Sequence, residues 1–559
     1  MSAITPQKFP VSNTIFETVL TTCRRIPDKT AIVGKGGRGA IYSYRDVEHL
    51  IRGISGSLRS KGLTKGDRVA IISENCPEWG LSFLGILTAG CVAVPFDASL
   101  KETELARFLR VSGIKLIFAS PAWYKPVTDL VTLNGLSLEI VALNCDDNNF
   151  RRMVESESYV AAGIAGDDMA MLIYTSGTTG DPKGVILSHR NILGNIFSLV
   201  QIELLREEEV LLSVLPLHHT LESTCGLLFP LCGGMTVVYA RSRKSRDLIE
   251  DIKNNGVTCM IAVPLLYEKM YNAVNKRISE LPFPQKTALK SFYAISKLAW
   301  KLGPNIGRTL FKGLRTKVGL EKVDIMVSGG APLPRAVSEW FNLLGFAFLN
   351  GYGMTECSPV ISVARPGEVR FESAGPPLPD VEIEIDNPSP DGIGEIKVRG
   401  PNCTCGYLDN PAATSELIRE GWLHTGDLGK MDKGHIYITG RKKNLIVSGG
   451  GKNIYPEEIE AELNLSPYIL ESIVFGRSRI KKAGEEIWAI IVPDLEQARP
   501  AGEIPDEISS PKRIREIVER EIAAVNDRLA DFKRIAQFEI RMEEFEKTST
   551  RKIKRGLYI

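Results

Sequence analysis

The chain has 559 residues, an apolar fraction of 43%, and 69 Lys plus Arg against 67 Asp plus Glu. This length predicts several domains with sizeable cores, and the near-neutral balance argues against nucleic acid as a partner. The ten cysteines show no CxxC or Cys/His spacing typical of a zinc site, and they indicate a reducing compartment.

The N-terminal sequence MSAITPQKFPVSN lacks the basic-then-apolar pattern of a secretory signal. The longest uncharged stretch, Gly80–Phe96, contains glycines and Pro95 and is too short for a spanning helix. It predicts a buried helix that turns into a strand. We therefore expect a cytoplasmic protein.

Apolar runs bounded by Gly and Pro alternate with helical patterns along the chain. Arg68–Ile72 and Cys91–Pro95 resemble strands, and Trp79–Thr88 between them resembles a helix. Such alternation predicts layered α/β subdomains with mostly parallel sheets. Val381–Ile385 and Gly394–Val398 instead alternate apolar and charged residues, as half-exposed strands do.

A loop rich in glycine and hydroxyl groups follows the strand-like run Met169–Ile173. Glycines let backbone amides approach an anion closely, hydroxyls add donors, and a lysine supplies a point charge for phosphate oxygens. A solvated surface turn is the alternative. The candidate phosphate-binding residues are Thr175, Ser176, Gly177, Thr178, Thr179 and Lys183.

The string from Tyr174 to Gly184 resembles the signature loop of the adenylate-forming, or AMP-binding, superfamily, which includes acyl-CoA synthetases, luciferases and the adenylation domains of peptide synthetases. The resemblance covers nearly the whole chain and is most like long-chain fatty acyl-CoA synthetases. It implies a large N-terminal domain of α/β subdomains with a small β-barrel-like part, residues 1–442. A small mobile α/β lid, residues 443–559, would follow a hinge at Lys443.

Three further strings match the superfamily's motifs in its order. Pro216–His219 resembles the motif whose last residue, His219, flanks the acyl carboxylate; a His pair alone is more often structural. Ser328–Leu333 is similar to the segment under the adenine ring, and Asn350–Glu356 to the next motif. By resemblance, adenine lies against Gly329, Gly330, Ala331, Pro332, Asn350, Gly351, Tyr352 and Gly353; Thr355 touches the α-phosphate, and Glu356 with Thr175 holds Mg²⁺.

The remaining motifs lie toward the C-terminus. Trp422–Asp427 resembles the ribose-binding segment, so Asp427 would accept bonds from the ribose hydroxyls. Arg441 would also contact the nucleotide. The tail Lys547–Arg555 resembles the motif with the catalytic lysine, which falls on Lys552. The common pattern has Gly immediately before this lysine, whereas this chain has Arg551. Several long-chain acyl-CoA synthetases also have a larger residue at this position.

The resemblance implies two half-reactions. A carboxylate attacks the α-phosphorus of ATP to give acyl-AMP and pyrophosphate, and coenzyme A then takes the acyl group. The protein's task is positioning and charge stabilisation, with Lys552, Glu356, Thr355 and His219 as catalytic candidates. The implied cofactors and substrates are ATP, Mg²⁺, coenzyme A and a fatty acid.

A long basic segment points to the substrate class. Residues 285–317 contain no Asp or Glu, and Lys286, Lys290, Lys297 and Lys301 recur at helical spacing. A solvated hairpin is one interpretation, and a peripheral contact with the inner face of a membrane is the other. An insertion here resembles long-chain fatty acyl-CoA synthetases, where Tyr267 would gate the acyl tunnel.

Other functions stay open at this point. The acceptor can be an acyl-carrier protein instead of coenzyme A, and the acid can be aryl or branched. A non-catalytic nucleotide-binding or membrane-associated protein on the same fold is a further alternative, although it would have no need of Lys552.

Overall fold

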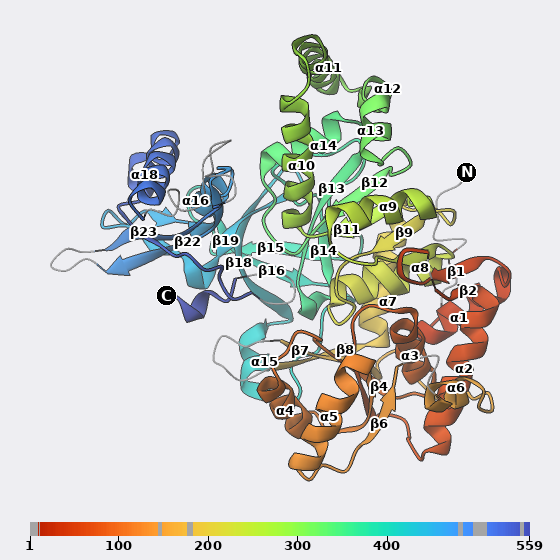
Figure 1. Ribbon diagram of the computed structural model, residues 1–559. Coiled ribbons are helices and arrows are strands. Elements are labelled where there is room, and N and C mark those ends of the chain that lie inside the picture. The colour runs from red at the N-terminus through yellow and green to blue at the C-terminus, as the bar shows by residue number, and fades with distance from the viewer. Residues whose placement is uncertain are drawn as a thin grey trace. The chain divides into compact units, whose positions relative to one another are not determined.

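The computed structural model describes residues 9, 12–37, 39–143, 148–161, 163–175, 183–478, 484–495, 511–547 and 553–559. The chain forms two compact units (Figure 1). The first unit comprises Met1–Ile383 and Val398–Leu423, and the second comprises Glu384–Lys397 and His424–Ile559.

A six-stranded sheet of the first unit has the order β6-β5-β3-β4-β7-β8. All its pairs are parallel except β7 with β8, and the buried parallel strands are rich in Val, Ile and Leu, as expected when helices cover both faces. Its elements are β3 (Arg68–Ile72), β4 (Val92–Phe96), β5 (Ile114–Ala119), β6 (Glu139–Ala142), β7 (Met169–Thr175) and β8 (Lys183–Ser188), with α2 (Tyr44–Ser60), α3 (Pro77–Thr88), α4 (Glu102–Val111), α5 (Pro121–Leu133) and α6 (Asn148–Val154).

An eight-stranded sheet of the same unit has the order β14-β13-β12-β11-β9-β10-β1-β2 and is antiparallel only at its two ends. Its strands are β1 (Thr30–Val33), β2 (Ile41–Ser43), β9 (Val210–Ser213), β10 (Thr236–Tyr239), β11 (Cys259–Ala262), β12 (Ile325–Ser328), β13 (Ala347–Gly353) and β14 (Val360–Val363). The helical elements of this region are α1 (Ile15–Arg25), η1 (Lys35–Gly37), α7 (His189–Gln201), the π-helix η2 (Leu221–Leu228), α8 (Phe229–Gly233), α9 (Ser245–Asn255), α10 (Pro264–Ser279), α11 (Phe283–Leu302), α12 (Gly307–Leu310), α13 (Lys312–Val318), α14 (Arg335–Leu343) and η3 (Thr355–Cys357).

The boundary between the units runs through short strands that follow these sheets. They are β15 (Glu382–Asp386), β16 (Gly394–Arg399), β17 (Ile418–Arg419), β18 (Trp422–Asp432) and β19 (His435–Arg441), with α15 (Pro411–Leu417) between β16 and β17. The second unit includes Glu384–Lys397, and its continuous part begins at His424, ahead of the hinge predicted at Lys443. The reason is that β18 and β19 pair antiparallel, so residues 424–441 stay with the chain that follows them.

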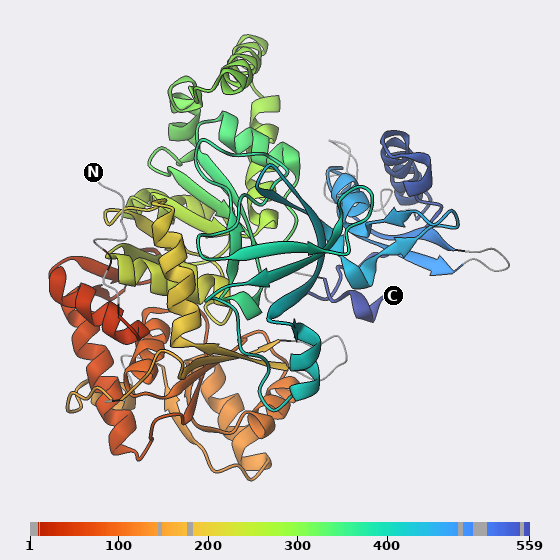
Figure 2. The same cartoon turned by 180° about the vertical axis from the view of Figure 1, so that it is seen from behind.

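The second unit carries a three-stranded sheet, in which β22 pairs antiparallel and β24 parallel with β23. Helices α16 and α18 cover one face of this sheet (Figures 1 and 2). Phe545 and Tyr558 pack with the side chains of its other face. Its elements are η4 (Lys442–Asn444), β20 (Ile446–Val447), β21 (Asn453–Ile454), α16 (Pro456–Leu463), β22 (Ile469–Ser478), β23 (Glu485–Pro493), α18 (Pro511–Arg528), η5 (Asp531–Lys533), β24 (Gln537–Ile540) and η6 (Arg555–Leu557).

The elements predicted from sequence are confirmed with small shifts at their ends. The strand predicted over Arg68–Ile72 is β3, and the predicted helix Trp79–Thr88 is α3, which begins two residues earlier at Pro77. Helix α16 begins at Pro456, with Glu457 and Glu458 in its first turn, where carboxylates favour the helix dipole. Among the described residues, none of the helices has both the length and the apolar character needed to cross a bilayer.

Candidate functional site

The predicted phosphate loop lies between two strands of the first unit that pair antiparallel. Strand β7 ends at Thr175 and β8 begins at Lys183, and these two residues are paired in register. The Thr175 hydroxyl lies 3.4 Å from the backbone carbonyl oxygen of Lys183. The hairpin therefore holds both ends of the loop together. Ser176, Gly177, Thr178 and Thr179 lie outside the described residues.

The two predicted adenine segments leave neighbouring parallel strands. Ser328 at the end of β12 is paired with Asn350 in β13, so the segment Gly329–Pro332 starts beside the Asn350–Gly353 motif. Gly330 has a φ of +87° and is exposed together with Ala331 and Pro332, which leaves backbone open to a flat ring. A flat surface of this kind suits a nucleotide base.

The motif then turns sharply and buries Glu356. A Cβ on Gly353 would lie 1.9 Å from the backbone oxygen of Pro359, so only glycine fits at this turn. Glu356 is 8% exposed, and its Oε1 accepts a hydrogen bond of 2.8 Å from the Tyr407 hydroxyl. The backbone N–H of Thr404 donates to the Glu356 carbonyl over 2.8 Å.

Tyr407 connects Glu356 to the phosphate hairpin. The Lys183 ammonium lies 5.2 Å from the centre of the Tyr407 ring, within the range of a cation–π contact. Residues 406–408 run beside β8. The backbone N–H of Ile186 donates to the carbonyl of Gly406, and the backbone N–H of Leu408 donates to the carbonyl of Gly184. Lys183 and Glu356, which are 173 positions apart, thus meet on one aromatic side chain.

Sequence reasoning did not single out Tyr407. Its only local signal is the Gly406-Tyr407 pair after a strand, which does not distinguish a surface tyrosine from a site residue. Burial first, and then the neighbouring Glu356 carboxylate, raise the pKa of Tyr407. The hydroxyl therefore stays protonated and remains a donor to Glu356.

The His218-His219 pair lies at the start of the π-helix η2. His218 is buried, with its Nε2 3.5 Å from Asp97 Oδ2, and the two imidazole rings are 4.2 Å apart. His219 is half-buried, and Leu221, two residues on, is the side chain nearest to a Cβ placed on Gly329. This contact brings the histidine motif next to the predicted adenine segment.

Tyr267 occupies a different environment from that expected of a gate. It is 0% exposed, and its hydroxyl donates toward the carbonyls of Met260 and Val327 at 3.0 and 3.1 Å. Its ring packs edge-on against Phe341 and Phe348. A side chain held in this way is fixed in the core, and movement of its ring would break both hydrogen bonds.

Glu222, which we did not predict, is a completely buried acid in η2. Its Oε1 accepts a 2.5 Å hydrogen bond from the Ser213 hydroxyl. Burial raises the pKa of Glu222 to about 8. A π-helix is uncommon and is often found at functional sites, and this one follows directly from the histidine motif.

The raised pKa of Glu222 predicts a pH-dependent stability. The folded chain binds this proton more tightly than the unfolded chain, so the free energy of unfolding falls as pH rises from about 4.5 to 8. The slope is at most about 1.4 kcal/mol per pH unit. Burial lowers the pKa of His189 to about 4, which has the opposite effect but only below its ordinary pKa of 6.5.

In the window from pH 6.5 to 8 the His189 effect is absent, and Glu268, whose pKa burial raises to about 7, is common to wild type and a Glu222 variant, so the difference between these two proteins isolates Glu222. Glu222→Gln should become more stable relative to wild type across this window, by about 1–2 kcal/mol in total, as measured by urea unfolding at each pH. Glu280→Gln, at the exposed end of α10, serves as the control. A stability difference that does not change with pH would contradict the assignment.

The second unit brings two other predicted residues together. Asp427 and Arg441 are directly paired in β18 and β19, and Arg441 Nε lies 2.6 Å from Asp427 Oδ1. Asp427 is 5% exposed, whereas Arg441 is half-buried. The guanidinium thus orients one carboxylate oxygen. Lys443 follows in η4 and is exposed, and Lys552 lies outside the described residues.

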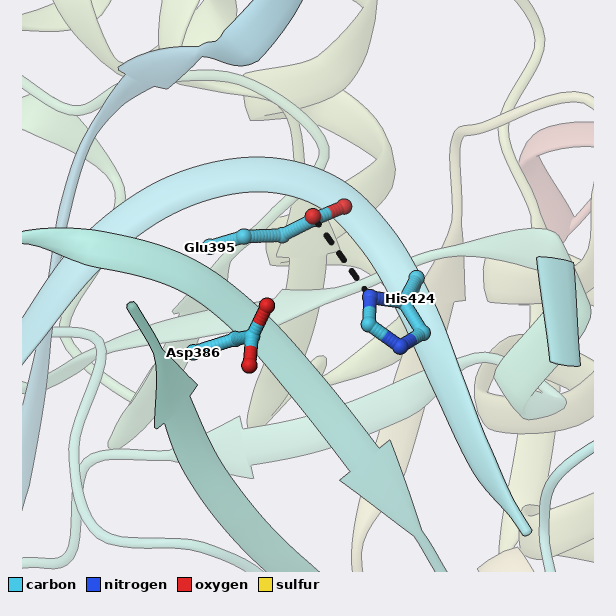
Figure 3. A group of neighbouring side chains, drawn as sticks. All are labelled: Asp386, Glu395 and His424. Carbon is cyan, nitrogen blue, oxygen red and sulfur yellow. Dashed lines mark ion pairs between the residues drawn. The ribbon is translucent and has the colours of Figure 1, made fainter. Parts of the chain in front are cut away.

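Asp386, Glu395 and His424 form a polar cluster (Figure 3), and His424 lies in β18, three residues before Asp427. Their ligand atoms lie within 4.8 Å of one another, but Glu395 already accepts from Lys442 Nζ at 2.8 Å and from the Gly426 amide at 3.1 Å. Burial alone would raise the pKa of Glu395, but Lys442 lowers it overall. Because Glu395 is already bonded to Lys442 and to the Gly426 amide, the cluster suits a structural role in which it holds the turn before Asp427.

Comparison with known proteins agrees with this geometry. The sequence pattern of the family described as AMP-binding enzyme matches residues 19–408, well over half of the chain. The chain belongs to the AMP-binding enzyme family. The match ends just past Tyr407, so it includes Thr175, Lys183 and Glu356. Asp427, Arg441, Lys443 and Lys552 lie beyond it.

Relatives of this AMP-binding enzyme include a long-chain-fatty-acid–CoA ligase from Salmonella typhimurium, 29% identical over 502 residues that cover 82% of this chain and 81% of the relative. A chloroplastic long-chain-fatty-acid–[acyl-carrier-protein] ligase from Arabidopsis thaliana is 27% identical over 540 residues, which cover 82% of this chain and 73% of the relative. The structure of ATP-bound MatB from Rhodopseudomonas palustris has a TM-score of 0.77 at 24% identity and covers 98% of each chain. The fold is that of adenylate-forming enzymes.

Proposed function

We propose that this chain is an ATP-dependent, AMP-forming ligase that activates a long-chain fatty acid and transfers it to coenzyme A. The observation that carries the proposal is the meeting of Lys183 and Glu356 on Tyr407, in the unit that also exposes the backbone of Gly330–Pro332. A cation, a carboxylate and a flat backbone surface are the elements that a nucleoside triphosphate needs.

The residues around Glu356 suit magnesium chemistry. Mg²⁺ prefers hard oxygen ligands beside phosphates. Glu356 Oε1 is oriented by Tyr407, so its other carboxylate oxygen together with the Thr175 hydroxyl would hold the ion. When bound, Mg²⁺ would neutralise charge on the phosphate oxygens. Lys183 would bind the phosphate chain, and Asp427, oriented by Arg441, would accept the ribose hydroxyls.

His219 and Lys552 would act on the carboxyl group. His219 lies two residues before the π-helix η2, whose first residue, Leu221, is next to the predicted adenine segment, and its imidazole would flank the acid as it approaches the α-phosphorus. Lys552 would stabilise the charge shared by carboxylate and phosphate. A hinge at Lys443 would then let the small domain bring coenzyme A to the acyl-adenylate.

The long-chain acid and the thiol acceptor are supported by the named relatives. A CoA ligase and an acyl-carrier-protein ligase are both among them, so an acyl-carrier protein is the alternative acceptor. Pyrophosphate release should depend on a saturated C12–C18 acid, and a thioester should form with coenzyme A. Product on an acyl-carrier protein alone would select the alternative, and no AMP from any acid would reject the ligase.

We also propose a peripheral membrane contact through α11, which lies at the outer end of α10, away from the eight-stranded sheet (Figure 1). Leu289, Tyr293 and Ser296 face inward onto the core. The opposite side exposes an apolar stripe with Ile295 48%, Leu298 61% and Leu302 76% accessible.

The charges beside this stripe favour an anionic bilayer. Lys290 and Lys301 are exposed on α11, and Lys297 pairs with Glu339 at 2.5 Å. Residues 281–320 contain no Asp or Glu. Lysines next to exposed Leu and Ile are typical of helices that lie in the headgroup region. Such a contact would place the enzyme where fatty acids partition.

The contact predicts which residues control vesicle binding. Leu298→Glu with Leu302→Glu should reduce flotation with phosphatidylglycerol vesicles at least about ten-fold, because each buried leucine contributes a few kcal/mol. Lys290→Glu should weaken binding less, and added salt should weaken it too. Leu133→Glu, on α5 and 83% exposed, is the control. Equal flotation of all variants would reject the contact.

A further inference from the structure

Two cysteines lie beside the Glu356 motif. Cys357 follows Glu356 directly and is 0% exposed, and its Sγ is 4.0 Å from the Sγ of Cys403. Cys403 is half-buried, and Cys405, two residues further, is exposed. The two sulfurs are far apart in sequence and need to approach by only about 2 Å to reach disulfide length.

The segment that carries Cys403 also holds Glu356 in place. Asn402 donates to the Cys357 carbonyl at 2.9 Å, and Thr404 donates to the Glu356 carbonyl at 2.8 Å. Tyr407 donates to the Glu356 carboxylate. Residues 402–407 therefore form a clamp on Glu356, and we call this segment the Glu356 clamp.

The clamp is anchored on its other side to the strand and helix that follow the phosphate loop. Asn191 donates to the carbonyls of Pro401 and Cys403 at 3.0 and 2.7 Å, and the Thr404 hydroxyl donates to the carbonyl of Ile186. Because the clamp is held from both sides, a pull on Cys403 is transmitted to Glu356 and Tyr407. We expect that closing the gap of about 2 Å between the sulfurs draws the two backbone segments toward each other.

We propose that Cys357 and Cys403 form a redox pair whose disulfide switches off adenylation. The oxidant is hydrogen peroxide: the Cys403 thiol takes one of its oxygens to give a sulfenic acid and one water, and the Cys357 thiol then attacks that sulfur and displaces the hydroxyl as a second water to form the disulfide. A dithiol reductant reverses the step. The half-buried Cys403 is the sulfur that the oxidant reaches first.

The disulfide would act through the geometry of the nucleotide site. Displacement of the clamp moves the Tyr407 hydroxyl away from Glu356 Oε1 and disturbs the Lys183 contact on the same ring. A shift of about 1 Å in a positioned group costs on the order of a hundred-fold in rate. The effect on rate rests on the proposed function, whereas formation of the bond does not.

The test uses the full chain, reduced, then treated with a small excess of hydrogen peroxide and alkylated. Peptide mass spectrometry should find Cys357 cross-linked to Cys403, and ATP–pyrophosphate exchange with a fatty acid should fall about ten-fold or more. Dithiothreitol should restore it. Cys403→Ser should form no such cross-link and keep its ratio of treated to untreated exchange near one. Cys405→Ser should still form the Cys357–Cys403 cross-link and should show the same ratio of treated to untreated exchange as wild type.

The outcomes are separable. Absence of the Cys357–Cys403 cross-link overturns the proposal, and so does a cross-link with unchanged exchange. If peroxide also lowers exchange in Cys403→Ser, the oxidation that matters occurs at another residue, and the proposal is overturned. If no acid supports exchange even in the reduced chain, the proposed function fails. ATP binding by the oxidised and reduced chains then decides the redox inference, with weaker binding expected after oxidation.

Discussion

Lys552→Ala should abolish adenylation and spare the second half-reaction. We expect ATP–pyrophosphate exchange to fall by about a hundred-fold or more, because a cation that stabilises charge in the transition state is lost. Thioester formation from supplied acyl-AMP and coenzyme A should stay within a few-fold of wild type. The two assays measure the half-reactions separately, so they distinguish a catalytic role from general damage.

A lysine close to Lys552 in the sequence provides the control for this prediction. Lys547 and Ile553 form an antiparallel bridge, and Lys547 Nζ pairs with Glu471 at 2.7 Å. Arg555 pairs with Glu460 at 2.5 Å. These contacts fix the chain on both sides of residue 552. Lys554→Ala tests a second lysine of the same tail and should retain most exchange. Full exchange by Lys552→Ala, or equal loss of both half-reactions, would contradict the role.

Glu356→Gln should reduce adenylation about a hundred- to a thousand-fold, because the isosteric amide keeps the shape but removes the charge that holds Mg²⁺. Tyr407→Phe should cost about ten-fold, since it removes only the hydrogen bond that orients Oε1. Exchange measured across a Mg²⁺ titration should show a raised metal requirement in both variants.

The double variant tests whether Tyr407 acts through Glu356. If it does, Tyr407→Phe should add little once Glu356 is Gln, and the two effects should be strongly non-additive. Tyr271→Phe, on α10 and packed against Trp340, controls for loss of a tyrosine hydroxyl. Additive losses would mean that Tyr407 contributes by another route, such as its contact with Lys183.

The sequence was sufficient for the parts of this protein that depend on neighbouring residues. Helix α16 begins at Pro456 because proline and early acids suit a helix start. The strand β3 and the helix α3 were predicted from apolar runs bounded by glycine and proline, which is a local pattern. Resemblance then named most site residues.

Tertiary structure alone decided which distant side chains touch. No local pattern marks Tyr407 as the link between Lys183 and Glu356, or Cys403 as the neighbour of Cys357. The same holds for Tyr267, whose burial depends on helices that pack around it. Helical spacing located the lysines of α11, but only packing determined that its leucines face outward. The physical reason is range: backbone preference acts over a few residues, whereas burial and contact depend on chains brought together by the whole fold.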